Sequence, residues 1–344
     1  MGKEHNVTKS SFEYKRSLKE RISDSRYELN RKIFYGKPNK KASHINERRK
    51  RLFFITAMLA IPALNWLIFW LFVNVQSFML AFQDPRTGSL TLDNFAEVWE
   101  FVTSPINNEL GISLMNTLKY FGTSVLIVMP LCLVVSFFFY KRIFGYKVFR
   151  IIFYLPAIIS SVVMVTAYSE FVSPTGPLGA IQRAFGMEVN PVSPLSRSET
   201  ATNTILVYCV LTGLTTNVLL FTSGMSRIPI EVLEAAKLDG VGPARELCSI
   251  IFPLIWPTFS TQFIFALTGI FNSSGPILLF TNGGYNTSTI AFWIFQKLYG
   301  TTGQGPSIGA YNLVSALGLC CTVIGVPLVL FARKLTEKID SVEY

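Results

Sequence analysis

Six apolar stretches, each long enough to cross the hydrocarbon core of a membrane as a helix, constrain the fold more than any other feature of this sequence. Such a core is about 30 Å thick and takes roughly 20 helical residues to cross. Each stretch has at least that length, so we predict an all-α polytopic membrane protein with six transmembrane helices. The predicted spans are residues 52–75, 114–140, 149–171, 204–224, 254–280 and 307–331.

The composition supports this fold class. Of the 344 residues, 50% are hydrophobic and only 15% are charged, which is too apolar a balance for an ordinary soluble protein. The first apolar stretch begins far beyond the usual position of a signal peptide and is longer than the apolar part of one, so we expect it to remain as a span. In the third span Pro156 predicts a kink, because proline removes one backbone hydrogen bond from a helix.

Positive charge gathers at the N-terminus. Residues 1–51 contain 16 Lys or Arg against 6 Asp or Glu, and this excess equals the net charge of the whole chain, +10. A basic arm of this kind can hold nucleic acid or face anionic lipid. No aromatic stacking motif and no zinc-ligand spacing accompanies the basic residues, so we favour a cytoplasmic tail that faces the lipid bilayer and expect no nucleic acid as a partner.

The remaining Lys and Arg residues predict how the spans are oriented. If both termini lie inside, 26 Lys or Arg fall on the inner side of the membrane and 4 on the outer side, which is a strong positive-inside asymmetry. We therefore predict a multi-pass plasma-membrane protein whose N- and C-termini are cytoplasmic. The predicted divisions are a basic tail at 1–51, the first span with its outer loop at 52–113, a five-helix core at 114–334 and a C-terminal tail at 335–344.

A polar stretch at 228–257, which we call the island, interrupts the apolar runs on the inner side of the membrane. Pro229 suits the first position of a short helix, since its missing N–H needs no partner there, and Gly240 is expected to end that helix. Gly242 and Pro243 are expected to turn the chain and begin a second helix. The apolar stripe predicted on this second helix consists of Ala244, Leu247, Cys248 and Ile251. A helical pair of this kind at a membrane surface is a candidate docking element.

The sequence lacks the motifs of common catalytic classes. Its two Gly-Lys pairs lack the upstream glycine of a Walker A sequence. Both histidines, His5 and His44, lie in the tail, which excludes a Ser/His triad, an HExxH zinc site and a histidine relay in the membrane. The five cysteines have no CxxC spacing. We therefore predict a non-enzymatic chain with no catalytic residue, no metal site and no cofactor of its own.

Almost no charge falls within the spans. Lys119 and Glu170 are the clearest candidates, and both are near the outer ends of their spans, where long side chains are expected to reach the interface. An ion-coupled carrier usually buries acidic or basic groups along its path. The scarcity of such groups weighs against an ion-coupled carrier and implies that a partner supplies the energy for transport.

The island also contains a spaced set of residues, Glu234-Ala235-Ala236, then Gly240, then Ile250 and Phe252-Pro253. This set resembles the EAA motif of the permease subunits of binding-protein-dependent ABC importers. It differs only in having phenylalanine where the family usually has leucine before the proline. An EAA triplet alone is common in helices, but the complete spacing is specific.

Other short sequences extend the resemblance. They are Asn116-Thr117, Leu155-Pro156 and residues 281–284, although Tyr285 stands where many family members have proline. The chain is most similar to the carbohydrate-uptake group of maltose-permease-like proteins, which have an additional first helix and pair with a second permease subunit. The resemblance therefore implies a bacterial cell membrane and a heterodimer of permeases.

The resemblance implies a function for the island. In the family this element, here 228–253, is a cytoplasmic coupling helix that docks in a groove of an ATPase subunit. Two copies of the ATPase would bind ATP and Mg and would drive the permeases between inward- and outward-facing states. The implied coupling residues are Ile230, Leu233, Glu234, Ala235, Ala236, Asp239 and Gly240.

These coupling residues would have different roles. The two alanines would allow close approach, and the carboxylates would pair with basic groups of the ATPase. Ile230 and Leu233 would supply apolar contact, but packing against the chain's own spans is an equal alternative for both. The glycine at 240 would permit a sharp turn, which is compatible with an ordinary helix cap.

The solute is predicted from the polar side chains of the spans. The absence of fixed charge favours an uncharged solute, and we expect a sugar or oligosaccharide delivered by an extracytoplasmic solute-binding protein. That protein would dock on the outer loops at 83–111, 173–203 and 281–306. The predicted substrate-pathway residues are Tyr168, Asn217, Gln262, Asn272, Ser273 and Tyr285. Each can instead form a hydrogen bond between helices.

Three alternatives to a sugar importer are open at this point. The first is an importer of the same type for a non-sugar solute. The second is an ion-coupled secondary carrier, which the scarcity of charge disfavours. The third is a membrane scaffold without solute flux, against which the spacing of the coupling-helix residues speaks.

Overall fold

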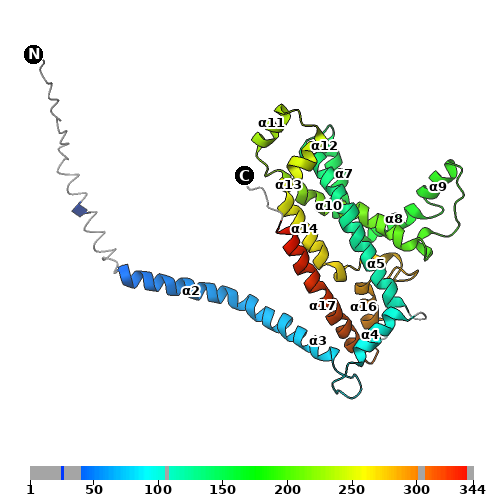
Figure 1. Ribbon diagram of the computed structural model, residues 1–344, viewed down its shortest axis with the longest axis horizontal. Helices are drawn as coiled ribbons and strands as arrows, with labels where there is room; N and C mark the ends of the chain where they lie inside the picture. Colours follow the sequence, from blue (N-terminus) through cyan, green and yellow to red (C-terminus); the bar gives the residue numbers. More distant parts are fainter. Residues whose placement is uncertain (1–24, 27–39, 105–107, 301–306, 339–344) are drawn as a thin grey trace, which may run out of the picture. The chain divides into compact units, whose positions relative to one another are not determined.

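The computed structural model describes residues 25–26, 40–104, 108–300 and 307–338. Within these ranges every regular element is a helix (Figure 1), so the predicted all-α class is confirmed. Four helices are long and apolar enough to cross a membrane, and two bent helix pairs raise the number to six if each pair is one span. The four long helices are Glu47–Ala81, Glu109–Tyr140, Ala201–Met225 and Ala310–Thr336.

The chain divides into two compact units, residues 1–74 and 75–344. In the first unit, α2 (Lys40–Asn65) and the π-helical η1 (Trp66–Phe72) form apolar helix, and most of the basic tail lies outside the described residues. The described side chains of this unit are exposed along its whole apolar length, where the rings of Trp66 and Trp70 stack at 5.1 Å. A helix that is apolar on every side is suited to a lipid environment.

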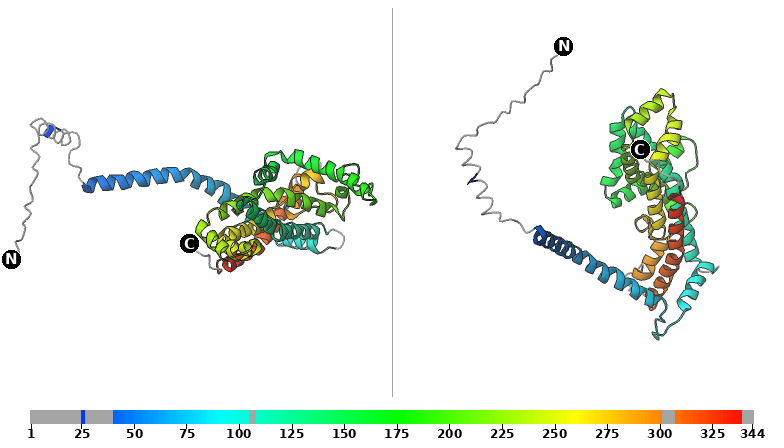
Figure 2. Two further views of the ribbon diagram at one scale, coloured as in Figure 1. Left: turned by 90° about the horizontal axis from the view of Figure 1, so that it is seen from above. Right: turned by 60° about the vertical axis from the view of Figure 1, so that its left-hand side comes forward.

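The second unit is a helical bundle, seen from two further directions in Figure 2. Packing pairs within it join α10 to both α6 and α7, and α17 to both α14 and α16. The elements that build the bundle are α5 (Glu109–Thr123), η2 (Ser124–Val128), α6 (Met129–Tyr140), α7 (Tyr146–Ile158), α8 (Ser161–Val172), α10 (Ala201–Met225), α14 (Trp256–Thr268), α16 (Ile290–Tyr299) and α17 (Ala310–Thr336).

Helices α6 and α10 form the tightest pair of the bundle. The buried Ser136 hydroxyl donates a hydrogen bond to the Val218 carbonyl at 3.0 Å, and the Cys132 thiol approaches the Leu214 carbonyl at 3.7 Å. Small polar side chains allow two membrane helices to approach closely and supply hydrogen bonds between them. The pair therefore forms a firm centre for the end of the bundle that carries the island.

The third and fifth predicted spans are bent. Helix α7 contains Pro156 and ends at Ile158, and α8 follows after a bend of 108°. The kink predicted at Pro156 is not where the bend lies: α7 continues through this proline, and the chain turns between Ile158 and Ser161, where the backbone of Ile159 is extended. The fifth span ends early, because α14 stops at Thr268 and the short η5 (Ile270–Asn272) and α15 (Ile277–Phe280) replace its outer part.

Each predicted outer loop contains a helix that the sequence pattern concealed. These helices are α4 (Asp93–Thr103), α9 (Pro177–Ala184) and α16. In the last loop, Thr289 caps α16 by accepting a hydrogen bond from the Phe292 N–H at 3.4 Å, and Trp293 is buried. The abundance of Gly, Thr and Asn around α16 marks only its ends, while its own ten residues are apolar enough to pack on α5 and α17.

Two asparagines hold the chain between α3 (Val73–Ala81) and α4. The Asn94 amide donates to the Ala81 and Gln83 carbonyls at 2.9 and 3.0 Å, and the Asn312 amide of α17 donates to the Leu80 and Gln83 carbonyls at 3.0 and 2.7 Å. Nearby, backbone N–H groups of Arg86 and Thr87 donate to the Asp84 carboxylate and lower its pKa. These contacts give the segment between α3 and α4 a defined backbone path.

A second polar clamp fixes the start of α16 on α5. The buried Asn116 amide donates to the Asn286 and Ser288 carbonyls at 2.7 and 2.9 Å. The adjacent Thr117 hydroxyl accepts a hydrogen bond from the Ile290 N–H at 3.0 Å. Asn116 and Thr117, which resemble a family motif in the sequence, therefore hold the start of α16 against α5 in this chain.

We expect Asn116→Asp to lower the free energy of unfolding of the solubilised chain by about 1–3 kcal/mol, because a carboxylate cannot donate to the two carbonyls. The Ser288 carbonyl then loses the amide donor, and the Asn286 carbonyl keeps only the Thr202 hydroxyl at 3.4 Å. Thermal unfolding in detergent measures the effect. Thr322→Ala serves as a control, since this exposed hydroxyl bonds only the Gly318 carbonyl of its own helix. Equal stability of the Asp variant and the wild type would contradict a clamp.

Candidate functional site

The first helix of the island is α11 (Ile230–Leu238), with Pro229 at the N-cap, one residue before the predicted position. Its C-terminal end is closed as predicted. The Val241 N–H bonds the Ala236 carbonyl, and the Gly240 N–H bonds the Lys237 carbonyl, both at 3.1 Å. This is a Schellman motif, which places the glycine in the left-handed region with φ of 69°. No atom outside its chain neighbours lies within 4 Å of where a Cβ would be, so backbone conformation alone selects glycine here.

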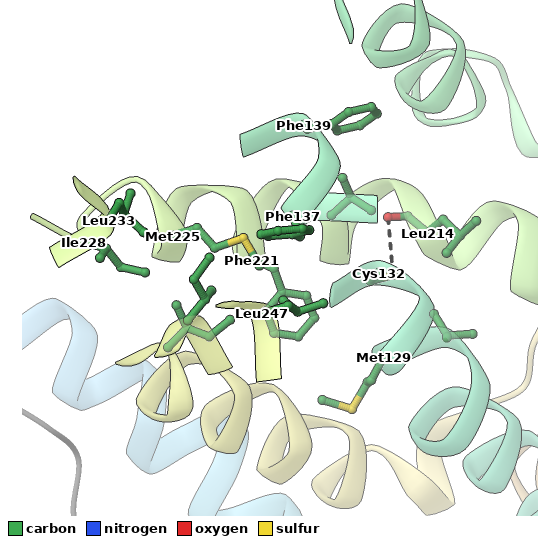
Figure 3. Close-up of a cluster of buried hydrophobic side chains, with 14 residues drawn as sticks. Met129, Cys132, Phe137, Phe139, Leu214, Phe221, Met225, Ile228, Leu233 and Leu247 are labelled. Carbon is green, nitrogen blue, oxygen red and sulfur yellow. Dashed lines mark hydrogen bonds between the residues drawn. The ribbon is translucent and has the colours of Figure 1, made fainter. Parts of the chain in front are cut away.

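Helix α11 rests on a buried apolar cluster, which we call the seat (Figure 3). Leu233 and Ile228 from the island meet Phe221 and Met225 of α10 within it. Further members come from α6 and from the second island helix. The buried members of the seat are Val128, Met129, Cys132, Phe137, Phe139, Leu214, Val218, Phe221, Met225, Ile228, Leu233, Leu247, Ile251 and Ile255.

The seat divides the predicted coupling residues into two groups. Leu233 and Ala236 are buried against this chain, at 8% and 5% exposure, so their side chains are not at the surface of α11. For Leu233 the alternative of packing on the chain's own spans therefore agrees with the structure. The other predicted residues are exposed: Ile230, Glu234, Ala235, Asp239 and Gly240.

The exposed face of α11 includes two residues that the sequence analysis did not single out. Leu238 is 90% exposed, and Glu231 lies three residues before Glu234 on the same face. Two carboxylates thus lie beside the exposed apolar side chains of Ile230 and Leu238. The helical period places both residues opposite Leu233, so they could be identified once the burial of Leu233 was known.

The second island helix begins as predicted with Gly242 at its N-cap and Pro243 in the first turn. It comprises α12 (Pro243–Arg245), the π-helical η4 (Glu246–Ile251) and α13 (Phe252–Leu254), and it bends by 74° into α14. Leu247 and Ile251 are buried, but the other two members of the predicted stripe, at 244 and 248, are exposed. The wider π turn rotates side chains away from the period of 3.6 that the stripe assumed.

A buried ion pair joins this second helix to the end of α6. Lys141 Nζ contacts a carboxylate oxygen of Glu246, whose side chain is 6% exposed while that of Lys141 is 26% exposed. The ammonium group also lies 5.7 Å from the centre of the Phe137 ring. The sequence analysis did not predict this pair. Glu246 could have indicated it, because a single glutamate near buried positions of a helix that enters the membrane needs a partner.

A cavity of about 300 Å³ lies among α5, η2, α10 and the outer part of α14. It brings together Asn217 and Ser273, two of the predicted pathway residues. Tyr120 also lines it, and its buried hydroxyl has no hydrogen-bond partner among the described residues. No charged side chain lines the cavity among these residues. The described residues also contain no cluster of three or more His, Cys, Asp or Glu that could hold a metal ion.

The other predicted pathway residues lie elsewhere. The Tyr168 hydroxyl donates to the Thr204 carbonyl at 2.9 Å, and its ring packs with Tyr208 and Phe280. Asn272 lines a different hollow between α14 and α17. Tyr285 is exposed with φ of 55° in the turn before α16, and Gln262 is partly buried on α14. Of the six predicted substrate-pathway residues, Asn217 and Ser273 therefore share this cavity and the other four do not line it.

Comparisons with known proteins point to one class. No family model matches the sequence. A multiple sugar-binding transport system permease protein of Streptococcus mutans is 27% identical over 200 residues, which are 58% of this chain and just under two thirds, 66%, of the relative. An arabinooligosaccharides transport system permease protein of Bacillus subtilis is 20% identical over 260 residues, which are 74% of this chain and 82% of the relative.

The fold has a solved counterpart. The chain is similar to one in the crystal structure of a bacterial ABC transporter involved in the import of the acidic polysaccharide alginate, with a TM-score of 0.71 and 22% identity over 86% of this chain and 99% of the other. The sequence relatives and the fold together support a carbohydrate-uptake permease of the ABC-importer type. The predicted resemblance to carbohydrate-uptake permeases is therefore supported, and both sequence relatives carry the name of a transport system permease protein.

We expect Lys141→Ala to lower the free energy of unfolding by about 3 kcal/mol, because it leaves the Glu246 carboxylate, whose side chain is 6% exposed, without its partner. Lys141→Glu and Glu246→Lys should each destabilise the chain, and the double variant that carries both changes should recover part of the loss. Thermal unfolding of these two single variants and of the double variant measures the coupling as a double-mutant cycle. Strictly additive effects would mean that the two side chains do not stabilise each other.

Proposed function

We propose that this chain is the membrane-spanning permease subunit of an ATP-driven carbohydrate importer and that it forms half of the translocation pathway. The observation that carries the proposal is the island, an exposed helix with a buried base in a chain whose relatives are sugar transport permeases. The chain has no Walker A sequence, so hydrolysis of ATP with Mg belongs to partner ATPase subunits, two copies of which complete the transporter.

In this proposal the exposed face of α11 is the surface that the ATPase binds. Ile230 and Leu238 enter an apolar groove, and Glu231 and Glu234 pair with basic groups at its rim. Leu233 has a different role, because it holds the helix on the seat, and Ala236 is buried on the same side of the helix. A displacement of α11 is then transmitted to α6 and α10, because side chains of the three helices share one close-packed cluster.

The cavity beside α5 and α10 is the proposed passage for the solute. Its Asn217 amide, Ser273 hydroxyl and Tyr120 ring offer hydrogen bonds and an aromatic face, which are the groups that sugars bind. Its lining carries no charge among the described residues, which favours a neutral sugar or oligosaccharide. A non-sugar solute of the same import type is the alternative within this class.

The proposed partners follow from the same class. A second permease subunit would supply the other half of the pathway. An extracytoplasmic solute-binding protein would deliver the sugar, and the alginate transporter has been solved in complex with a pentasaccharide-bound periplasmic protein. With the positive charge inside, the island and both termini face the cytoplasm of a bacterial cell.

An ion-coupled carrier is the second candidate function. Lys119 and Glu170, the two charged residues predicted within spans, are both exposed on the described bundle. The described buried ion pair, Lys141 with Glu246, lies at the inner end of the bundle, away from the cavity. Uptake by proteoliposomes that contain this chain without an ATPase would favour the carrier over the proposed importer.

We expect Gly240→Asp and Glu234→Lys to reduce ATP-dependent uptake at least about tenfold while membrane insertion is retained. The first change puts a charged side chain at the left-handed position that ends α11, where glycine is favoured, and the second reverses a charge on the docking face. Solute uptake, co-purification of the ATPase and solute-stimulated ATPase activity measure the effect.

The chain offers a matched control for each coupling variant. Gly186 closes α9 with φ of 72° and equally open surroundings, so Gly186→Asp introduces the same backbone strain outside the island. Glu188→Lys reverses an exposed charge near that position. Both controls should retain ATPase recruitment, and recruitment alone is compared for them, because residues 173–203 form one of the loops on which the solute-binding protein is expected to dock. Normal uptake and recruitment in the two island variants would rule out docking through α11.

We expect Asn217→Leu to reduce uptake strongly and to leave ATPase recruitment unchanged, because the larger apolar side chain fills the cavity and removes a polar group from it. Thr166→Leu is the control, since this exposed hydroxyl bonds only the Val162 carbonyl of its own helix. Concentration-dependent uptake of labelled sugars and co-purification of the ATPase measure the two properties. Unchanged uptake in the Asn217 variant would exclude the cavity as the passage.

A further inference from the structure

A second hollow lies at the end of the bundle that carries the island. Its volume is about 520 Å³, within the usual range for ligand sites. It is formed where α6 ends, α7 begins and α10 ends. The lining residues are Phe139, Tyr140, Arg142, Tyr146, Arg150, Leu219, Thr222, Ser223 and Ser226.

The hollow has a cationic rim. Arg142 lies in the turn between α6 and α7, while Tyr146 and Arg150 are one helical turn apart on the same face of α7. The ion pairs found among the described residues include neither arginine. The nearby carboxylate of Glu246 is already paired with Lys141. Two arginines therefore line the hollow without a carboxylate partner in the described part of the chain, and the Arg150 guanidinium lies 5.6 Å from the centre of the Tyr154 ring.

The floor of the hollow is mixed. Phe139 and Leu219 supply apolar surface, and four lining positions of α10 repeat at the spacing of one helix face. The hydroxyls of Thr222 and Ser226 donate to carbonyls of their own helix at 2.7 and 2.8 Å. The arginines are thus the main donors available to a ligand, with apolar surface directly beneath them.

The backbone at Arg142 provides an independent observation. The Arg142 N–H bonds the Phe139 carbonyl at 3.2 Å, and the Ile143 N–H bonds the Phe138 carbonyl at 3.4 Å. This is the same cap that ends α11, but arginine occupies the position where glycine is favoured, with φ of 51°. A side chain that the backbone conformation disfavours indicates a use for the side chain itself.

We propose that this hollow binds a phosphate-bearing anion. Two guanidinium groups can grip phosphate oxygens in the fork geometry that arginine favours. The hollow lies where the apolar part of α6 ends, at the depth of lipid headgroups, and its apolar floor suits the first carbons of an acyl chain. An anionic phospholipid supplies both parts of this ligand, whereas inorganic phosphate supplies only one.

The test uses the full-length chain, purified in detergent with the subunits that accompany it. Its unfolding temperature is followed during titration with short-chain phosphatidylglycerol, with phosphatidylcholine of the same chain length, and with inorganic phosphate. We expect phosphatidylglycerol to raise the unfolding temperature and phosphatidylcholine to leave it nearly unchanged. A rise produced by inorganic phosphate at the same concentrations would assign the site to the free anion.

The decisive variant is Arg142→Gly. Glycine relieves the left-handed strain, so the variant should fold and unfold near the wild-type temperature without ligand. Loss of one charge-assisted contact should nevertheless raise the half-saturating phosphatidylglycerol concentration about tenfold. Arg150→Gln should have a similar effect, and Arg142→Lys should keep part of the response because it keeps the charge.

The matched control is Lys147→Gln, which removes one positive charge from an exposed position on α7 that does not line the hollow. It should change the half-saturating concentration less than about twofold. Equal weakening by Lys147→Gln and Arg142→Gly would overturn the proposal, because it would show a diffuse attraction to the basic end. An equal response to phosphatidylcholine and phosphatidylglycerol would overturn it as well.

Discussion

Close packing beneath α11 is the contact on which the rest of this structure depends. Leu233 and Ile228 enter a cluster that also contains side chains of α6, α10 and the second island helix. A short helix of nine residues is marginal in isolation, so its position comes from this burial. Because tightly packed interiors transmit displacement, the seat makes α11 a rigid extension of the bundle and leaves its other face free.

The two ends of the bundle are held by different chemistry. At the end that carries the island, apolar packing is completed by the contact of Lys141 with Glu246. At the end that carries α4 and α16, asparagine amides bind backbone carbonyls that regular helix bonds leave unpaired, as Asn116 does before α16 and Asn312 does after α3. Side-chain donors of this kind give irregular backbone one defined path within a membrane protein.

Between these ends lie two departures from regular α-helix. The π-helical η2 borders the cavity, and the π-helical η4 carries the glutamate of the buried ion pair. Such segments often occur at functional positions because they widen the turn and redirect side chains. In the proposed transport cycle they are the places where the bundle can change shape between the seat and the solute passage.

Hydropathy was sufficient to predict the long helices, because an apolar run of more than 20 residues has few structures available to it in a membrane other than a spanning helix. It failed for α16, whose ten apolar residues lie between glycine-rich segments and are too short to be recognised as a span. Glycine and proline signals located the ends of α11 and the start of α12 to within one residue. Two of the four residues in the apolar stripe predicted on the second island helix are exposed, because the π turn changes the helical period that the stripe assumed.

By itself, the sequence determined the helical class, the long spans, the position of the island and the family, because these depend on local properties that few contacts can override. Only the tertiary structure decided that Leu233 faces inward while Leu238 faces outward, that Asn217 and Ser273 share a cavity with Tyr120, and that two arginines meet at one hollow. Those facts depend on residues far apart along the chain. Their physical origin is the packing of α6, α7, α10 and α14 against one another, which no local pattern specifies.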